Sequence, residues 1–166
     1  FCGARLVEDY STIWQVKNSP ESLFELQFTV QDVNNLAFWF LSSSYGGRRG
    51  FAPTSGLFNA YGPNDERAAW NVGFDPRGRR VGFKYRRIQS NDDNPVVIRL
   101  AEMYLIRAEA NWRMGATATV VLADVNRIRQ RAGLAPLDSA VIDTSDELRD
   151  AILRERRLEF AFEGMQ

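Results

Sequence analysis

The chain has 166 residues, a mass of 18.9 kDa and 45% hydrophobic residues, which suits one globular domain with a core of its own. Twenty-one Lys and Arg balance 21 Asp and Glu, so no overall charge attracts nucleic acid or a membrane surface. Histidine is absent and Cys2 is the only cysteine, which excludes a histidine-based triad and an intrachain disulfide. No run reaches the roughly 20 apolar residues that a membrane-spanning helix needs.

The first 31 residues predict a short helix followed by a strand. Residues 5–16 carry apolar side chains at helical spacing and end at a turn containing Pro20. Residues 23–31 then alternate between apolar and polar side chains, which predicts a strand with one buried face. The side chains expected on that buried face are Phe24, Leu26, Phe28 and Val30.

Residues 32–80 lack periodicity and are rich in aromatic residues, glycine and asparagine. They predict a long, decorated loop region with a short helix at 54–61, and such loops are usually functional or packed against something else. Residues 80–88 alternate again and predict a second strand, which could pair with the first.

Three amphipathic helices are predicted in residues 94–166. The first covers 96–114 and ends at Gly115, and the second covers 118–132 and ends at Gly133. The third begins with a capping box formed by Thr144 and Glu147.

Charged residues lie within and beside these helical stripes. Two glutamates could form the carboxylate pair of a glycosidase, since hydrolysis of a glycosidic bond uses two carboxyl groups about 5–10 Å apart. We favour the other interpretation, in which they form ion pairs with helix arginines and fix the helix register. The residues concerned are Glu102, Glu109, Glu155, Arg156, Arg157 and Glu159, with Arg99, Arg107, Arg127 and Arg131 as expected partners.

Three ordered segments of this helical part resemble the C-terminal part of the SusD/RagB family. They are VIRLAEMYLIRAEANWRMG (97–115), VLADVNRIRQRAGL (121–134) and ILRERRLEFAFEG (152–164). Upstream, SPESLFELQF (19–28) and APTSGLFNAYGPNDER (52–67) are similar to the family's strand and its A-P-T…D-x-R region.

The resemblance implies a mainly α fold with minor β: a tetratricopeptide-like, SusD-like helical scaffold with irregular loops and a short two-stranded sheet. We expect a single SusD/RagB C-terminal domain over 1–166, with the loops in 1–93 and the three-helix part in 94–166. Family members are about three times this long and normally continue beyond the E-G at Gly164. The chain is therefore expected to be a C-terminal fragment, in which Cys2 is buried and inert rather than the cysteine that carries lipid.

The resemblance further implies a surface-exposed lipoprotein of the outer membrane. Such proteins bind an oligosaccharide or polysaccharide, in some members a peptide, and partner a SusC-like TonB-dependent transporter. They are not enzymes and need no cofactor. A helical-repeat module that binds another protein remains the alternative, since helix faces rather than loops would then make the contact.

Sugar sites combine aromatic platforms for C–H ring faces with polar or Arg side chains for hydroxyl groups. The aromatic loops offer that mixture, while core packing is an equally good interpretation of the large aromatic residues. The residues predicted to contact a glycan are Trp39, Tyr45, Arg48, Tyr61 and Trp70.

Two other patterns are interpreted as structural. The basic run 76–87 superficially resembles a nucleic-acid-binding strand, but net neutrality and the lack of a recognised motif favour a solvated strand face. Asp92, Asp93 and Asn94 lack the spaced ligands of a calcium loop, so a turn with a helix cap is expected rather than a metal site.

Overall fold

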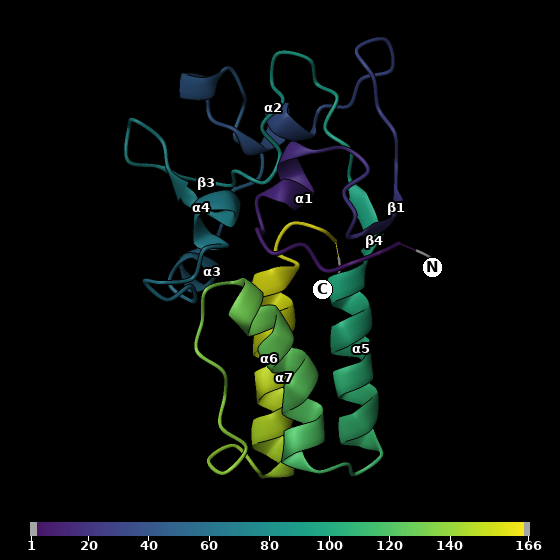
Figure 1. The fold of residues 1–166 in the computed structure, drawn as a ribbon. Coiled ribbons are helices and arrows are strands. Elements are labelled where there is room, and N and C mark those ends of the chain that lie inside the picture. The colour runs from purple at the N-terminus through teal and green to yellow at the C-terminus, as the bar shows by residue number, and fades with distance from the viewer. Residues whose placement is uncertain (1–2, 165–166) are drawn as a thin grey trace.

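The computed structural model describes residues 3–164 as an upright bundle of three helices beneath a loop layer, residues 3–99, of turns and short elements (Figure 1). The helices of the loop layer are α1 (Thr12–Gln15), α2 (Leu36–Phe40), α3 (Ser55–Phe58) and α4 (Ala68–Asn71), with a 3-10 turn at Ser43–Tyr45. Its strands are β1 (Ser22–Glu25), β2 (Gly73–Phe74), β3 (Arg80–Val81) and β4 (Val96–Arg99). The bundle consists of α5 (Leu100–Arg113), α6 (Ala118–Arg131) and α7 (Ser145–Glu159). The mainly α fold expected from the sequence is confirmed, and Cys2 lies outside the described residues.

The bundle forms where the apolar stripes predicted it. Gly115 (φ 73°) and Gly133 (φ 75°) adopt the left-handed conformation that ends a helix, and Thr144 with Glu147 closes the capping box of α7. The stripes meet in one core cluster of Ala101, Leu105, Ala108, Val121, Leu122, Val125, Ile128, Leu148, Ile152 and Phe160. The helices are therefore held by burial of their apolar faces.

The first long helix starts later than predicted, because a strand takes the place of its predicted first turn. Val96–Arg99 forms β4, which pairs antiparallel with β1 through Ser22↔Arg99, Phe24↔Ile98 and Glu25↔Val96, and α5 begins only at Leu100. The run Val-Val-Ile favours a pleated strand because β-branched side chains restrict the helical conformation.

The predicted buried face of the first strand is also wrong. β1 ends at Glu25, and Phe24, Leu26 and Val30 are exposed while Glu25 is buried. The Glu25 carboxylate accepts hydrogen bonds from the backbone N–H of Asn18 (2.6 Å) and from Asn94 Nδ2 (2.8 Å). These polar contacts turn the carboxylate inward and the apolar side chains outward.

The second predicted strand shrinks to β3, which pairs with β2 instead of β1. Lys84 and Tyr85 are consecutive and both buried, which a strand with one buried face cannot achieve. The predicted helix over 5–16 is likewise only α1, and that over 54–61 is α3, with the Thr54 side chain capping its N-terminus. Among residues 3–164 no helix is both long and apolar enough to cross a bilayer.

Leu105→Ala should destabilise the protein by about 2–5 kcal/mol, because it opens a cavity where α5 meets α6 and α7. Leu105 is fully buried, whereas Leu153 on α7 is 54% exposed, so Leu153→Ala is the matched control and should cost less than about 1 kcal/mol. Urea unfolding followed by circular dichroism measures both. Equal losses would contradict this description of the core.

Candidate functional site

Trp39 is the exposed aromatic residue around which a candidate surface can be built. It lies on α2, remains 37% exposed, and meets the rings of Phe38 and Phe51 at centroid distances of 5.4 and 6.4 Å. The guanidinium of Arg48 lies 5.6 Å from the centre of the Trp39 ring, within cation–π range. Two of the five predicted residues, Trp39 and Arg48, are thus brought together.

The segment 46–51 produces this arrangement by folding back against α2. The N–H groups of Arg48 and Phe51 donate to the carbonyls of Phe38 (2.7 Å) and Trp39 (3.1 Å). A Cβ on Gly47 would stand 2.2 Å from the carbonyl oxygen of Leu41, so only glycine permits this approach. Phe51, 56% exposed beside Trp39, was not predicted as a site residue, and the glycine-rich run before it is the signal that could have indicated the reversal.

Tyr45 and Trp70 lie further along the same loops. Tyr45 is partly exposed and packs edge-on against Phe83 at 5.6 Å. Trp70 is half-buried, packs against the core around α1, and carries the Arg86 guanidinium on its ring at 3.8 Å. Since Arg86 also lies 5.2 Å from the Phe83 ring, these side chains form a continuous line of contacts.

Tyr61 is engaged inside the fold. Its hydroxyl donates to the carbonyl of Leu158 on α7 (2.9 Å) and accepts from Asn71 Nδ2 (2.9 Å). Burial raises its pKa above the ordinary value of 10. The hydroxyl therefore ties the loop to the bundle, and contact of Tyr61 or any of the other four residues with a ligand stays a prediction.

Beneath this surface, charged side chains form a buried ion-pair network centred on Glu159. Its carboxylate accepts hydrogen bonds from Arg99, Arg131 and Arg67, and all four side chains are almost wholly buried. The network extends to Asp65, Glu21, Lys84, Glu155 and Glu163, with Arg129 at its edge. It joins α6 and α7 to β4 and to distant segments of the loop layer.

The geometry within the network satisfies nearly every charge. Arg67 donates to both Asp65 oxygens at 2.8 Å and to Glu155 at 2.5 Å. Arg99 donates to both oxygens of Glu163 at 2.8 and 3.0 Å, and Glu163 also accepts from Lys84 at 2.7 Å. Bidentate pairing of this kind gives directed, charge-assisted hydrogen bonds.

The pKa values of the network follow from burial and charge. Burial alone would raise the pKa of the Glu159 carboxyl, but attraction by Arg131, Arg99 and Arg67 outweighs it and holds that pKa well below its ordinary value. Burial raises the pKa of Glu155 despite the Arg67 guanidinium beside it. For Lys84, burial lowers the pKa to about 8, with Glu163 opposing the shift.

The structural interpretation of the helix charges is therefore borne out for Glu159, which pairs with Arg99 and Arg131 as expected. Glu155 pairs instead with Arg67, a loop residue that helix reasoning did not consider. Glu109 forms an exposed pair with Arg113 within α5. Because each of these carboxylates is bound by arginine, the arrangement is better suited to holding the fold than to acid–base chemistry.

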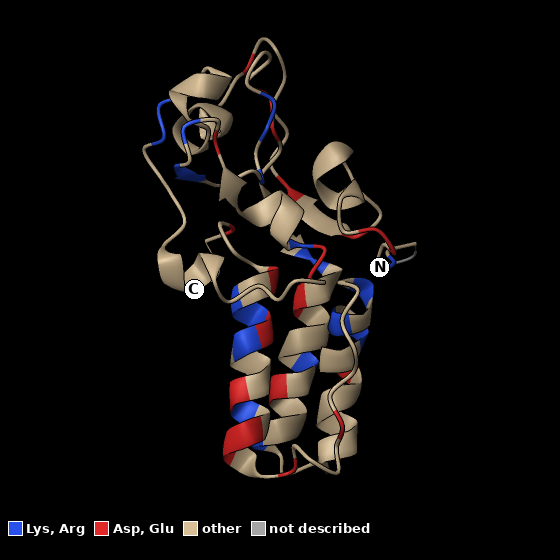
Figure 2. Cartoon of the chain, turned by 90° about the vertical axis from the view of Figure 1, so that its left-hand side faces the viewer, with Lys and Arg blue, Asp and Glu red and all other residues tan. Residues whose placement is uncertain are grey.

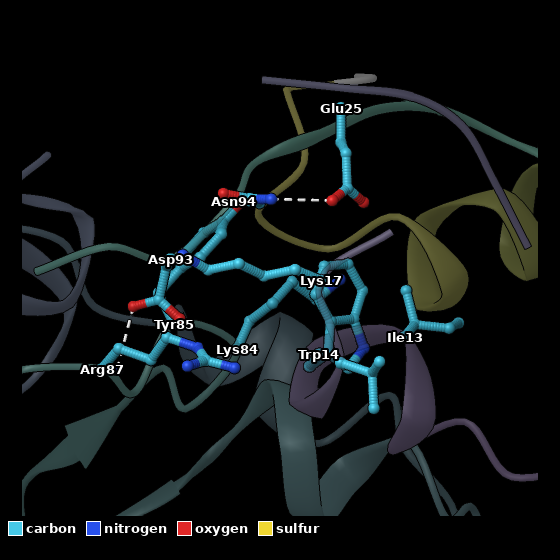
Figure 3. Close-up of a pocket in the computed structure, with 10 residues that line it drawn as sticks. Ile13, Trp14, Lys17, Glu25, Lys84, Tyr85, Arg87, Asp93 and Asn94 are labelled. Atoms are coloured by element: carbon cyan, nitrogen blue, oxygen red, sulfur yellow. Dashed lines mark hydrogen bonds between the residues drawn. The ribbon is translucent and has the colours of Figure 1, made fainter. Parts of the chain in front are cut away.

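A small pocket lies between α1 and the turn before β4 (Figure 3). Trp14, Lys84, Glu25, Asp93 and Asn94 are among its lining residues, and its volume is about 10 Å³. That is about the volume needed for one water molecule, so the pocket is too small for a sugar ring.

The remaining predictions concern the turn and the basic run. Asp92 pairs with Lys17 at 2.5 Å, and Asp93 accepts from the backbone N–H of Arg87 at 2.9 Å, so both carboxylates serve the turn. The helix cap expected there is wrong, because a strand follows the turn and α5 begins only at Leu100. The solvated face expected for 76–87 is wrong in part, because Lys84 is buried beneath the Tyr10 and Trp14 rings.

Comparison with known proteins identifies the family. Residues 77–166, more than half of the chain, match the model of the SusD family. SusD-like protein P2 of Formosa agariphila is 36% identical over 90 residues, which are 51% of this chain and 18% of that protein. SusD-like protein P38 of the same organism is 39% identical over 80 residues, 45% of this chain and 16% of that protein. The chain belongs to the SusD family, as its motifs indicated.

Solved structures match nearly the whole chain. A surface glycan-binding protein A from Bacteroides uniformis superposes on 99% of this chain and 40% of its own, with a TM-score of 0.80 and 25% identity. A SusD superfamily protein from Bacteroides vulgatus superposes on 98% and 42%, with a TM-score of 0.81 and 24% identity. The chain thus spans about two-fifths of these structures and under a fifth of the curated relatives. The five predicted contact residues all precede the part matched by the family model.

Glu159→Gln should destabilise the protein by about 3–5 kcal/mol, because removing one buried charge leaves three arginines short of a counter-charge. Glu109→Gln is the matched control, since its exposed pair with Arg113 should contribute less than about 1 kcal/mol. Urea unfolding at neutral pH compares the two variants. A loss below 1 kcal/mol for Glu159→Gln would contradict a structural role for the network.

Acidification should destabilise the protein below about pH 4.5, the ordinary pKa of a glutamate. Because the folded-state pKa of Glu159 is lowered, its contribution to stability is complete above the unfolded-state pKa and is lost as the pH falls. Glu155, with a raised pKa, contributes with the opposite sign. Unfolding curves across this range should therefore show a weaker acid decline in Glu159→Gln and an undiminished one in Glu155→Gln; a decline unchanged by Glu159→Gln would refute the assignment.

Proposed function

We propose that this chain is part of a non-catalytic, cell-surface glycan-binding protein that serves a TonB-dependent oligosaccharide-uptake complex of the outer membrane. Membership of the SusD family supports the proposal, together with the 25% identity and close superposition on a surface glycan-binding protein. In this proposal the transporter is SusC-like, and a lipid anchor outside this chain holds the protein at the membrane.

The exposed Trp39 ring, with the Arg48 guanidinium 5.6 Å from its centre, is the observation that carries the ligand assignment. A flat apolar ring at the surface binds the C–H face of a sugar, while guanidinium N–H groups donate to its hydroxyl groups. Phe51 extends the platform on one side of Trp39. Tyr45 offers a further accessible ring and hydroxyl within the same loops.

Isothermal titration of the protein carrying this chain against a panel of oligosaccharides tests the proposal, with product analysis in the same samples. Binding without turnover is the expected result. Binding of a peptide, with no binding of any glycan, would identify peptides as the ligand class. Glycan turnover that is lost in Glu155→Gln or Glu109→Gln would favour a glycosidase. Capture of a protein that persists without the loop aromatics would favour the helical-repeat interaction module.

Trp39→Ala should weaken glycan binding roughly tenfold, because it removes the stacking platform while α2 stays anchored through Phe40 and Ala37. Phe24→Ala, which removes from β1 an aromatic ring that is more exposed (51%) than Trp39, is the control and should leave affinity unchanged. Titration of the best ligand from the panel measures both. Equal affinities for Trp39→Ala and the unmodified protein would remove Trp39 from the site.

A further inference from the structure

Positive charge is concentrated in the loops although the chain as a whole is neutral. Residues 33–91 contain nine Lys and Arg but three Asp and Glu, whereas the remainder contains 12 Lys and Arg and 18 Asp and Glu. Not one acidic residue occurs from Val33 to Asn64. Figure 2 shows more blue than red along the upper-left loops, while both colours alternate along the helices.

Burial of several charged side chains leaves the surface of residues 33–91 with mainly positive charge. Arg67 and Lys84 are buried and neutralised within the ion-pair network. Two of the three acids are buried as well: Asp65 binds Arg67, and Asp75 binds Arg79. The exposed charge of residues 33–91 is therefore almost entirely arginine.

Three of these arginines are linked by a chain of contacts that starts at the Trp39 platform. Arg48 lies over the Trp39 ring, and the Nε of Arg49 donates to the carbonyl of Arg80 at 2.9 Å. Arg80 Nε donates in turn to the carbonyl of Pro53 at 3.1 Å. These contacts orient Arg49 and Arg80 through Nε, and the terminal N–H groups of both side chains have no hydrogen-bond acceptor among residues 3–164. We call Arg48, Arg49 and Arg80 the arginine cluster.

The cluster differs from several exposed arginines of the bundle in how its charge is balanced. Three exposed helix arginines have carboxylate partners: Arg107 binds Asp124, Arg113 binds Glu109, and Arg149 binds Asp146. Arg127 and Arg154, also exposed on helices, have no carboxylate within 4.0 Å among residues 3–164, but no side-chain hydrogen bond in that range links either of them to another arginine. Within residues 3–164, no member of the arginine cluster has a carboxylate within 4.0 Å. Positive charges on linked segments without a counter-ion raise the local electrostatic potential, so the surface is suited to an anion.

We propose that the glycan bound at Trp39 is anionic and that the arginine cluster binds its carboxylate or sulfate groups. This inference rests on the proposed glycan-binding function and specifies its substrate class. The planar guanidinium fork donates two parallel hydrogen bonds to such oxyanions, and Arg remains charged throughout the physiological pH range. The aromatic ring supplies the stacking surface, and the arginines supply selection for negative charge.

Charge-matched glycan pairs test the inference: dextran against dextran sulfate, and methyl-esterified polygalacturonate against polygalacturonate, with single-stranded DNA as a polyanion that is not a glycan. Affinity electrophoresis should show at least one acidic polymer bound roughly tenfold more tightly than its neutral partner, with binding that weakens as salt is added. The pair that responds identifies sulfate or carboxylate as the recognised group.

Each other outcome is decisive. Neutral glycans of the panel bound as tightly as acidic ones would overturn the anionic inference and leave the proposed function standing. If no glycan binds, both the proposed function and the inference are refuted. DNA bound as tightly as the best acidic glycan would indicate a general polyanion surface and overturn selection for a glycan.

The double variant Arg48→Gln/Arg80→Gln should weaken binding of the acidic glycan roughly tenfold or more, since each arginine contributes a charge-assisted contact, and should reduce the salt dependence. Arg127→Gln/Arg154→Gln removes the same charge from exposed positions on α6 and α7 and should change neither quantity.

Arg48→Gln alone disturbs no hydrogen bond of its own side chain among residues 3–164, so it reports on binding even if the double variant is unstable. Unchanged affinity in Arg48→Gln, with circular dichroism confirming the fold, would refute the role of the cluster.

Discussion

The buried ion-pair network around Glu159 is the constraint on which the rest of the structure depends. Removing several charges from water is costly, and only mutual pairing with satisfied hydrogen bonds makes it tolerable. Each partner therefore has to arrive in register: Arg131 from the end of α6, Arg99 from the β4–α5 junction, and Arg67 from the loop before α4. The network stabilises one relative arrangement of bundle and loops, because any displacement would leave a buried charge without its partner.

This constraint explains what the recognition motifs encode. Several of the arginines and glutamates in the family motifs, among them Arg99, Arg131 and Glu159, are members of the network rather than of the candidate site. Glu163, at the end of the last motif, joins Arg99 and Lys84 in the same way. The motifs therefore report how the scaffold is held together. They carry no information about which ligand the loops contact.

The candidate ligand-binding residues lie on loop segments that the network holds in place. The 46–51 segment can lie against α2 because Gly47 admits the close approach, and this places Arg48 on Trp39. The Tyr61 hydroxyl ties the neighbouring loop to α7 by donating to the carbonyl of Leu158. A rigid base with side chains projecting from hydrogen-bonded turns is how a binding surface can vary in sequence while its support stays the same.

The sequence by itself determined the three bundle helices, the glycines that end them and the capping box at Thr144, because periodicity and capping depend on residues a few positions apart. It also determined the family. Tertiary structure decided that Val96–Arg99 is a strand, that Glu25 faces inward, and that Glu155 pairs with Arg67, since each depends on contacts between residues more than 60 positions apart. It likewise decided that Trp39 stays exposed while Tyr61 is drawn into the fold. Composition alone could not separate these aromatic side chains, because any of them could equally have packed in a core.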